Sequence, residues 1–173
     1  KNVDGRTALM IAAKKNNHNV IEALIKAGAN VNTHVDEDRL FSGNKTALMY
    51  AAEYNDAEAI KTLLEAGANV NAQDADGETA LMYAAEGNDP EVIKTLLKAE
   101  AKVNIQDEDG KTALMYAAEE SEHTEIINML LDAGANTSLQ DEDRMTAANF
   151  ARKNDHIRNT DVYSRLKQET KSN

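Results

Sequence analysis

Acidic turn residues come closest, in this chain, to a set of side chains that could do chemistry. The stretches DADG (Asp74–Gly77) and DEDG (Asp107–Gly110) place carboxylates directly before a glycine, and carboxylates at close spacing can bind calcium. A calcium loop of the EF-hand type also needs a third ligand before the glycine and a glutamate at its end, and both are absent here. We therefore expect water-exposed turn residues, with weak cation binding as the alternative.

The histidines do not have the spacing of metal ligands, and we expect them at the surface or in turns. They are His18, His34, His123 and His156. The chain contains no cysteine, which excludes disulfides, thiolate zinc sites and a cysteine nucleophile. The paired carboxylates Glu119 and Glu120 end a short predicted helix, where a solvated helix end is the simpler interpretation. No catalytic triad or phosphate loop can be assembled, so we predict no enzyme, no metal site and no cofactor.

The elements that must position these residues are copies of one unit. The octapeptide TALMYAAE begins at Thr46, Thr79 and Thr112, at intervals of 33 residues. A weaker copy, TALMIAAK, begins at Thr7, and a degenerate one, TAANFARK, begins at Thr146. Self-similarity at a fixed period predicts one supersecondary unit that is copied and stacked. Such a stack favours an extended binding surface over a catalytic pocket.

Each unit shows the same order of turn, helix, turn and helix. In the unit that covers residues 74–106, the turn Asp74–Gly77 precedes Thr79, a good helix N-cap. Apolar residues at helical spacing predict a first helix over 80–86 and a second over 90–99. Because helices this short are marginal alone, packing between neighbouring units must stabilise them.

This unit resembles the ankyrin repeat. The framework of that family runs approximately D-x-x-G-x-T-P-L-H-x-A-A, then an inter-helix turn, then V-V-x-L-L-L-x-x-G-A-x-V-N. Here DADGETALMYAA (Asp74–Ala85) and VIKTLLKAEAKVN (Val92–Asn104) match it closely, and the resemblance covers residues 2–155. It implies an all-α solenoid of helix–turn–helix units with hairpin-like finger loops. The TALM form of the motif favours a bacterial source.

We predict a single domain over residues 1–173. Its units cover about 2–34, 41–73, 74–106, 107–140 and 141–167, the last unit being a C-terminal cap, and residues 168–173 form a frayed tail. The interval from Thr7 to Thr46 is 39 residues, which locates an inserted finger loop at 33–44. Leu40 and Phe41 in this loop would make an attractive partner anchor. The alternative is that they fold back and pin the loop to the stack.

Two departures from the family pattern have structural consequences. The family's histidine is a methionine in four units, at Met10, Met49, Met82 and Met115, so apolar filler replaces a hydrogen-bonding ring. Glu100 stands where a glycine ends the second helix of three other units. If the backbone there is left-handed, Glu100 costs about 1 kcal/mol relative to glycine, and Glu100→Gly stabilises the protein.

In the ankyrin family, the finger tips and the outer side of the first helix line a concave groove that binds other proteins. Carried over to this sequence, the resemblance implies these groove positions: Arg6, Lys14, Lys15, Lys45, Glu53, Tyr54, Asp76, Glu78, Glu86, Asp109, Lys111, Glu119, Glu120, Asp143 and Arg144. The alternative for the charged residues is that they only keep the repeats soluble. Tyr50, Tyr83 and Tyr116 either pack between adjacent units or contact the partner.

Composition restricts the partner. A net charge of −11 disfavours nucleic acid and anionic membranes, which need clustered lysine and arginine, but allows a cationic protein surface. No apolar run approaches the roughly 20 residues that span a bilayer, and no signal peptide is visible. The start at Lys1, partway into a unit, suggests a trimmed N-terminus, and the compartment, cytoplasmic or exported, stays open.

These features predict a non-enzymatic, monomeric scaffold that binds another protein through a largely acidic concave face, and they allow that partner a basic surface. The alternative is a repeat spacer or targeting arm of a longer protein whose activity lies outside this segment.

Overall fold

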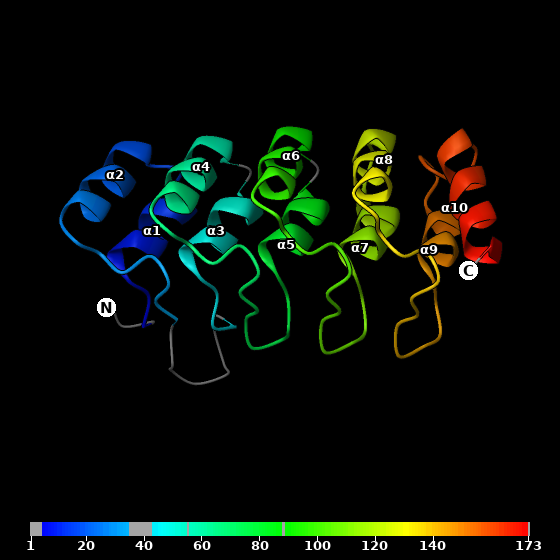
Figure 1. Cartoon of the computed structure of the whole chain (residues 1–173), viewed down its shortest axis with the longest axis horizontal. Helices are drawn as coiled ribbons and strands as arrows, with labels where there is room; N and C mark the ends of the chain where they lie inside the picture. Colours follow the sequence, from blue (N-terminus) through cyan, green and yellow to red (C-terminus); the bar gives the residue numbers. More distant parts are fainter. Residues whose placement is uncertain (1–4, 35–42, 55, 88, 173) are drawn as a thin grey trace.

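The chain forms two parallel rows of helices, with loops that project from one side (Figure 1). The computed structural model describes residues 5–34, 43–54, 56–87 and 89–172. The row of first helices consists of α1 (Ala8–Lys14), α3 (Ala47–Glu53), α5 (Ala80–Gly87), α7 (Ala113–Glu120) and α9 (Ala147–Lys153). The row of second helices consists of α2 (His18–Lys26), α4 (Ala57–Glu65), α6 (Pro90–Lys98), α8 (Thr124–Asp132) and α10 (Asp161–Ser172).

The predicted all-α solenoid is confirmed. Each first helix packs against the first helices of its neighbours and against the second helix of its own unit, and the two chain ends lie at opposite ends of the stack (Figure 1). The described residues contain no strand, only an isolated antiparallel bridge between Gln73 and Thr79 at the base of one finger loop.

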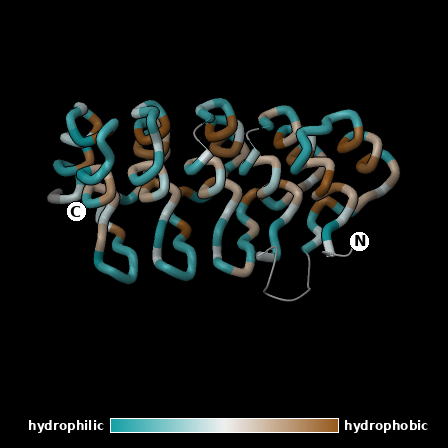
Figure 2. Tube along the Cα trace, turned by 180° about the vertical axis from the view of Figure 1, so that it is seen from behind, coloured by the Kyte–Doolittle hydropathy of each residue, from teal (hydrophilic) through white to brown (hydrophobic). Residues whose placement is uncertain are grey.

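The core is a series of thin layers between helix pairs. Figure 2 shows hydrophobic residues concentrated in the helices and hydrophilic residues at the tips of the fingers. In the third unit, Leu81 and Ala84 of α5 are buried together with Ile93 and Leu96 of α6, as the apolar spacing predicted. Full burial of an aliphatic side chain contributes about 1.5–3 kcal/mol, so these layers stabilise helices that are too short to stand alone.

A threonine and a methionine cap the first helices α1, α3 and α5 reciprocally. The hydroxyl of Thr46 accepts a hydrogen bond from the backbone N–H of Met49 at 3.3 Å, and the N–H of Thr46 donates to the sulfur of Met49, also at 3.3 Å. The same reciprocal pair joins Thr7 and Met10. Methionine here is therefore more than apolar filler, because its sulfur occupies the place of the acceptor in a capping box.

Backbone hydrogen bonds connect one finger to the next. The N–H···O distances are 2.7 Å from Ala75 to Gly43, 2.9 Å from Glu108 to Asp76 and 2.9 Å from Glu142 to Asp109. These bonds hold the fingers at a fixed spacing, so side chains at equivalent finger positions form a row along the stack.

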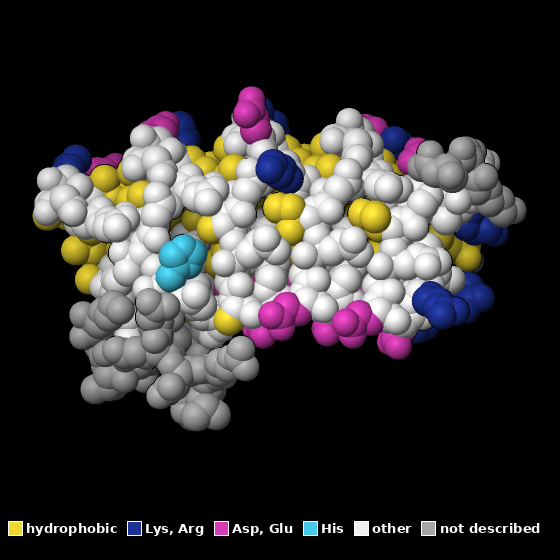
Figure 3. Space-filling view, turned by 60° about the horizontal axis from the view of Figure 1, so that its bottom comes forward, with side chains coloured by type: hydrophobic (Ala, Val, Ile, Leu, Met, Phe, Trp, Pro, Cys, Tyr) yellow, Lys and Arg dark blue, Asp and Glu magenta, His cyan; other side chains and the backbone are white. Residues whose placement is uncertain are grey.

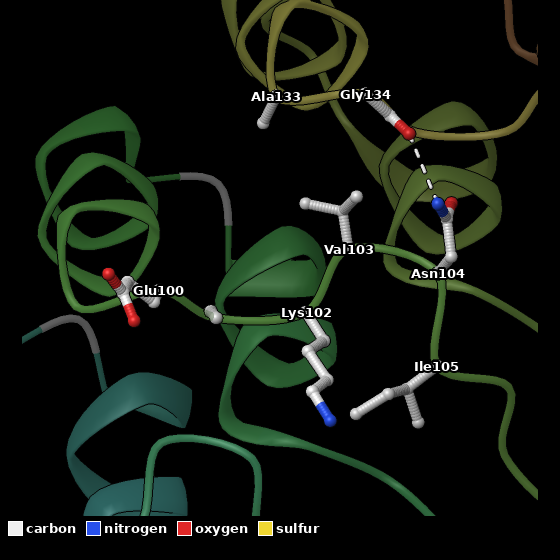
Figure 4. A pocket seen from close by; sticks show the side chains of 8 residues that line it. Glu100, Lys102, Val103, Asn104, Ile105, Ala133 and Gly134 are labelled. Carbon is white, nitrogen blue, oxygen red and sulfur yellow. Dashed lines mark hydrogen bonds between the residues drawn. The ribbon is translucent and has the colours of Figure 1, made fainter.

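An asparagine in each of the first three return loops links neighbouring units on the side of the second helices. The amide of Asn104 donates to the carbonyl of Gly134 at 3.1 Å (Figure 4), and its oxygen accepts from the N–H of Asn136 at 2.7 Å. A hollow of about 500 Å³ lies beside this link, lined mostly by the loop Glu100–Ile105. Glu100 has a φ of 64°, which places it in the left-handed region that we expected for this position.

The C-terminal end differs from the prediction of a frayed tail over 168–173. Helix α10 continues to Ser172, and the hydroxyl of Thr170 donates to the carbonyls of Leu166 at 2.7 Å and Thr137 at 3.2 Å. This contact with the fourth unit anchors a polar segment that carries no apolar stripe of its own. Val162 and Leu166 are buried against the stack, as expected for a cap.

Candidate functional site

The surface formed by the finger tips and the solvent side of the first helices, called the first-helix face below, is built on a column of aromatic rings. The rings lie four residues after each capping threonine from the second unit onward, at Tyr50, Tyr83, Tyr116 and Phe150. Tyr50, Tyr83 and Phe150 are buried and Tyr116 is half-buried. The tyrosines therefore pack between units.

Lysines cover this column in the second and fourth units. The ammonium nitrogen of Lys45 lies 2.9 Å from a carboxylate oxygen of Glu53 and 3.9 Å from the centre of the Tyr83 ring. Lys111 repeats the arrangement, 2.8 Å from Glu119 and 5.0 Å from the centre of the Phe150 ring. Each lysine thus pairs with the first helix of its own unit and reaches the ring of the next, which holds adjacent units together.

The surroundings of Lys111 keep its ammonium group protonated. Burial lowers the pKa of this ammonium, but its hydrogen bond to Glu119 and the nearby carboxylates of Glu119, Asp107 and Asp141 outweigh that effect and raise the pKa overall. The lysine therefore stays charged at neutral pH, between the aspartates of two successive fingers.

The third unit breaks this pattern, because Glu78 stands at the position of Lys45 and Lys111. The Tyr83 hydroxyl contacts carboxylate oxygens of both Asp74, at 2.6 Å, and Glu78. The Tyr116 hydroxyl contacts Glu78 at 2.9 Å and Asp107 at 2.8 Å. Glu78 thereby joins the tyrosines of two units.

Several groups in the third unit are shifted toward their protonated forms. Burial, followed by the hydrogen bonds to Asp74 and Glu78, raises the pKa of the Tyr83 hydroxyl well above its usual range. Burial also raises the pKa of Asp74, although its hydrogen bonds act against this. The pKa of Glu86 is raised by burial and then by the neighbouring carboxylates of Glu78 and Glu120. Negative charge is therefore in excess at the centre of the face.

A hollow of about 250 Å³ lies between the third and fourth fingers. It is lined by Asp76, Glu78, Asp107, Glu108, Asp109 and Tyr116. Figure 3 shows acidic side chains gathered along the lower edge of the finger side, over the middle of the stack, with lysine and arginine at the end of it. The hollow is thus walled by carboxylates and one aromatic ring.

Two of the Asp-rich turn residues differ from the expected water-exposed state. Asp74 is buried, and its second oxygen accepts hydrogen bonds from the N–H groups of Asp76 and Glu78 at 3.1 and 2.9 Å. Asp107 is half-buried and accepts from the N–H of Lys111 at 2.8 Å. The aspartates fold the fingers by accepting backbone hydrogen bonds, which explains their position before the glycine. One carboxylate oxygen from each of Asp74, Asp76 and Glu78 lies within 4.8 Å of the other two, a spacing at which three carboxylates could hold a cation.

The structure brings together six of the residues predicted for partner binding. Ion pairs, ring contacts or nearby charges connect Lys45, Glu53, Glu78, Glu86, Lys111 and Glu119 across three units. Asp76, Asp109 and Glu120 are exposed beside them. Asp143 and Arg144 are exposed on the fifth finger, outside this cluster.

Tyr54 is 37% exposed, with the Lys14 ammonium 5.5 Å from its ring centre. Leu40 and Phe41 lie outside the described residues.

Two further residues extend the face toward its ends: Arg6, which was among the expected groove positions, and Lys153, which was not. The guanidinium of Arg6 donates to the Tyr50 hydroxyl at 3.1 Å, which continues the column of paired side chains into the first unit. Lys153 lies 5.9 Å from the centre of the Phe150 ring and continues the column into the fifth. The signal was present in the register of the repeats, because Arg6 precedes its capping threonine as Lys45 and Lys111 do, and Lys153 stands at the position of Glu53 and Glu119.

Comparison with known families agrees with this architecture. The chain matches a family model described as ankyrin repeats (3 copies) over residues 1–74 and 55–141. The chain therefore belongs to the ankyrin-repeat family, whose members are generally protein-interaction modules and typically not enzymes. No match was found among curated proteins. Among the described helices, none is both long enough and apolar enough to cross a membrane.

Proposed function

We propose that this chain is a non-enzymatic scaffold that binds a partner protein through the first-helix face of its second to fourth units, and that the partner presents a basic surface. The observation that carries the proposal is the state of Glu86. This residue as a whole is exposed at the centre of the face, although its carboxyl group is partly shielded from solvent, and no described lysine or arginine forms an ion pair with it. Its counterparts Glu53 and Glu119 each pair with a lysine.

Charge and rigidity support the same function. A net charge of −11 steers a cationic partner toward the protein and makes the association sensitive to salt. The backbone hydrogen bonds between fingers fix the spacing of the exposed acidic residues Asp76 and Asp109. Little ordering of the finger backbone is then needed on binding, which reduces the entropic cost of association.

Comparative capture from a lysate of the source cells tests the proposal. The immobilised chain is compared with the variant Glu86→Lys/Asp109→Lys and with the control Glu58→Lys/Glu65→Lys, which makes the same charge change at exposed positions of α4. We expect partners to be retained by the wild type and by the control at low salt, and to be lost from the first-helix-face variant. Partners lost equally from both variants would mean that charge alone, and not this face, governs the association.

A further inference from the structure

One position of the first-helix face carries a glutamate in the third unit where the neighbouring units carry a lysine. Position 78 is equivalent to Lys45 and Lys111 in the repeat register, and Glu86 is equivalent to Glu53 and Glu119. In the neighbouring units the lysine and glutamate of this pair are 2.9 and 2.8 Å apart. The third unit therefore places two glutamates where its neighbours each place an ion pair.

The ring against which such a cation packs is present. The ammonium of Lys45 lies over Tyr83, the ring of the following unit, and that of Lys111 lies over Phe150. By the same register, a cation in the third unit would lie over Tyr116, which is half-buried and forms one wall of the hollow between the fingers. The Lys111 ammonium lies 5.2 Å from the centre of the same ring, just as Lys45 approaches the Tyr50 ring of its own unit at 5.9 Å. The volume of this hollow, about 250 Å³, accommodates the end of a lysine or arginine side chain.

The third unit also lacks hydrogen-bond donors. Two tyrosine hydroxyls make four contacts with the carboxylates of Asp74, Glu78 and Asp107. Each hydroxyl carries one hydrogen, so two of these four contacts have no donor while the three carboxylates are ionised. An ammonium group brings three N–H donors and a guanidinium five, together with the positive charge that the neighbouring units supply from within.

We propose that a lysine or arginine side chain of the partner protein docks between Glu78 and Glu86, against the ring of Tyr116, and takes the place that Lys45 and Lys111 hold in the adjacent units. This inference rests on the proposed function and specifies the chemistry of the contact. The partner completes a row of cations that alternates with the rings of the first-helix face.

The first experiment places a lysine of the chain itself at position 78. In Glu78→Lys we expect the new ammonium to pair with Glu86, and we expect the melting temperature to rise by about 2–4 °C. Glu78→Gln, which removes the charge and supplies no ammonium, separates this gain from simple relief of repulsion. If Glu78→Lys melts no higher than Glu78→Gln, the third unit does not hold a cation and the proposal is wrong.

The second experiment uses a tetralysine peptide with amidated and acetylated ends, followed by NMR of the side-chain carboxyl carbons. We expect the peptide to lower the pKa of Glu86 and to shift Glu78 and the Tyr116 ring first. We expect no such response in Glu78→Lys, and an unchanged response in the control Glu65→Lys. Shifts spread evenly over all finger carboxylates would contradict a specific position. A peptide whose lysines are acetylated controls for backbone contacts.

Two further outcomes are informative. If calcium chloride at matched ionic strength shifts Glu78 and Asp74 while the peptide does not, the site holds an inorganic cation and the proposal is overturned. If Glu78→Lys retains the captured partner and Glu86→Lys/Asp109→Lys loses it, the proposed function stands and this inference fails. Loss of the partner from Glu78→Lys, with retention by Glu65→Lys, supports both.

Discussion

The ammonium of Lys45 lies 3.9 Å from the centre of the Tyr83 ring, although the two residues belong to different units. The same ammonium is paired with Glu53 of its own unit at 2.9 Å. One side chain thus joins a finger, a first helix and the neighbouring first helix. Because its side chain is only 19% exposed, the contact is partly shielded from solvent and from salt. Electrostatics on this face therefore contributes to cohesion between units.

Replacing this lysine tests its contribution to stability. We expect Lys45→Met to lower the free energy of unfolding by about 1–2 kcal/mol, because it removes both the ion pair and the ring contact. Urea titration followed by circular dichroism measures the change. Lys61→Met, the same substitution at an exposed position of α4, is the control and should change stability by less than about 0.5 kcal/mol. Equal effects of the two variants would show that the contacts of Lys45 contribute nothing.

The left-handed backbone at Glu100 gives a prediction of the opposite sign. With a φ of 64°, this residue adopts a conformation that costs a non-glycine residue about 1 kcal/mol, so Glu100→Gly should raise the free energy of unfolding by about that amount. The reverse change in the second unit, Gly67→Glu, should lower it similarly, since Gly67 has a φ of 87° and no atom lies within 4 Å of an added Cβ. Thermal melts of both variants suffice, and a fall in stability for Glu100→Gly would contradict the assignment.

The close approach of the third and fourth fingers predicts a larger penalty at Gly77. A Cβ added there would lie 2.9 Å from the backbone nitrogen of Glu108, and the φ of Gly77 is 79°. Gly77→Ala should therefore destabilise the chain by more than Gly67→Ala, which carries the conformational cost of about 1 kcal/mol without a steric overlap. Similar urea midpoints for the two alanine variants would show that the fingers separate without cost.

The raised pKa of Glu86 predicts how stability varies with pH. Burial, with the carboxylates of Glu78 and Glu120 nearby, lets the folded chain hold this proton at a higher pH than the unfolded chain does. The stability that protonation contributes is therefore fully present below the unfolded pKa and is lost as the pH rises through the folded pKa. Glu86→Gln, which imitates the protonated form, should match the wild type near pH 4 and exceed it near pH 7.

Urea unfolding at several pH values tests this prediction. The measured quantity is the difference in free energy of unfolding between Glu86→Gln and the wild type, which cancels the titration of the other carboxylates. Glu65→Gln, on the exposed side of α4, is the matched control. If the difference for Glu86→Gln stays constant between pH 4 and pH 7, the pKa of Glu86 is not raised in the folded chain, and the excess of negative charge on this face is contradicted.

The fold could be predicted from the sequence because every level of the pattern agreed. The octapeptides at Thr46, Thr79 and Thr112 set the register, the threonines marked helix starts and the apolar spacing marked the buried side. The extension of α10 escaped prediction because it depends on a tertiary contact. Thr170 donates to Thr137, which lies 33 residues away, and no local pattern encodes that bond.

The pairing on the first-helix face was harder to predict. Glu53 follows Lys45 by eight residues, a spacing that is neither a helical nor a strand neighbour, so the ion pair depends on how the finger returns to the helix. The burial of Asp74 was missed for a related reason. Its acceptor role toward Tyr83 and the finger N–H groups appears only when the finger and α5 are folded together.

The exchange of glutamate for lysine at position 78 also has a genetic side. Codons for these two amino acids differ at a single base, so one point mutation separates a unit with a Lys–Glu ion pair from one with two glutamates at the same positions. Because the units share one register, the same mutation at position 45 or 111 would place a second glutamate at this register position of the array. Substitution alone would therefore change which units of such a protein carry the proposed partner contact, with no insertion, deletion or new loop.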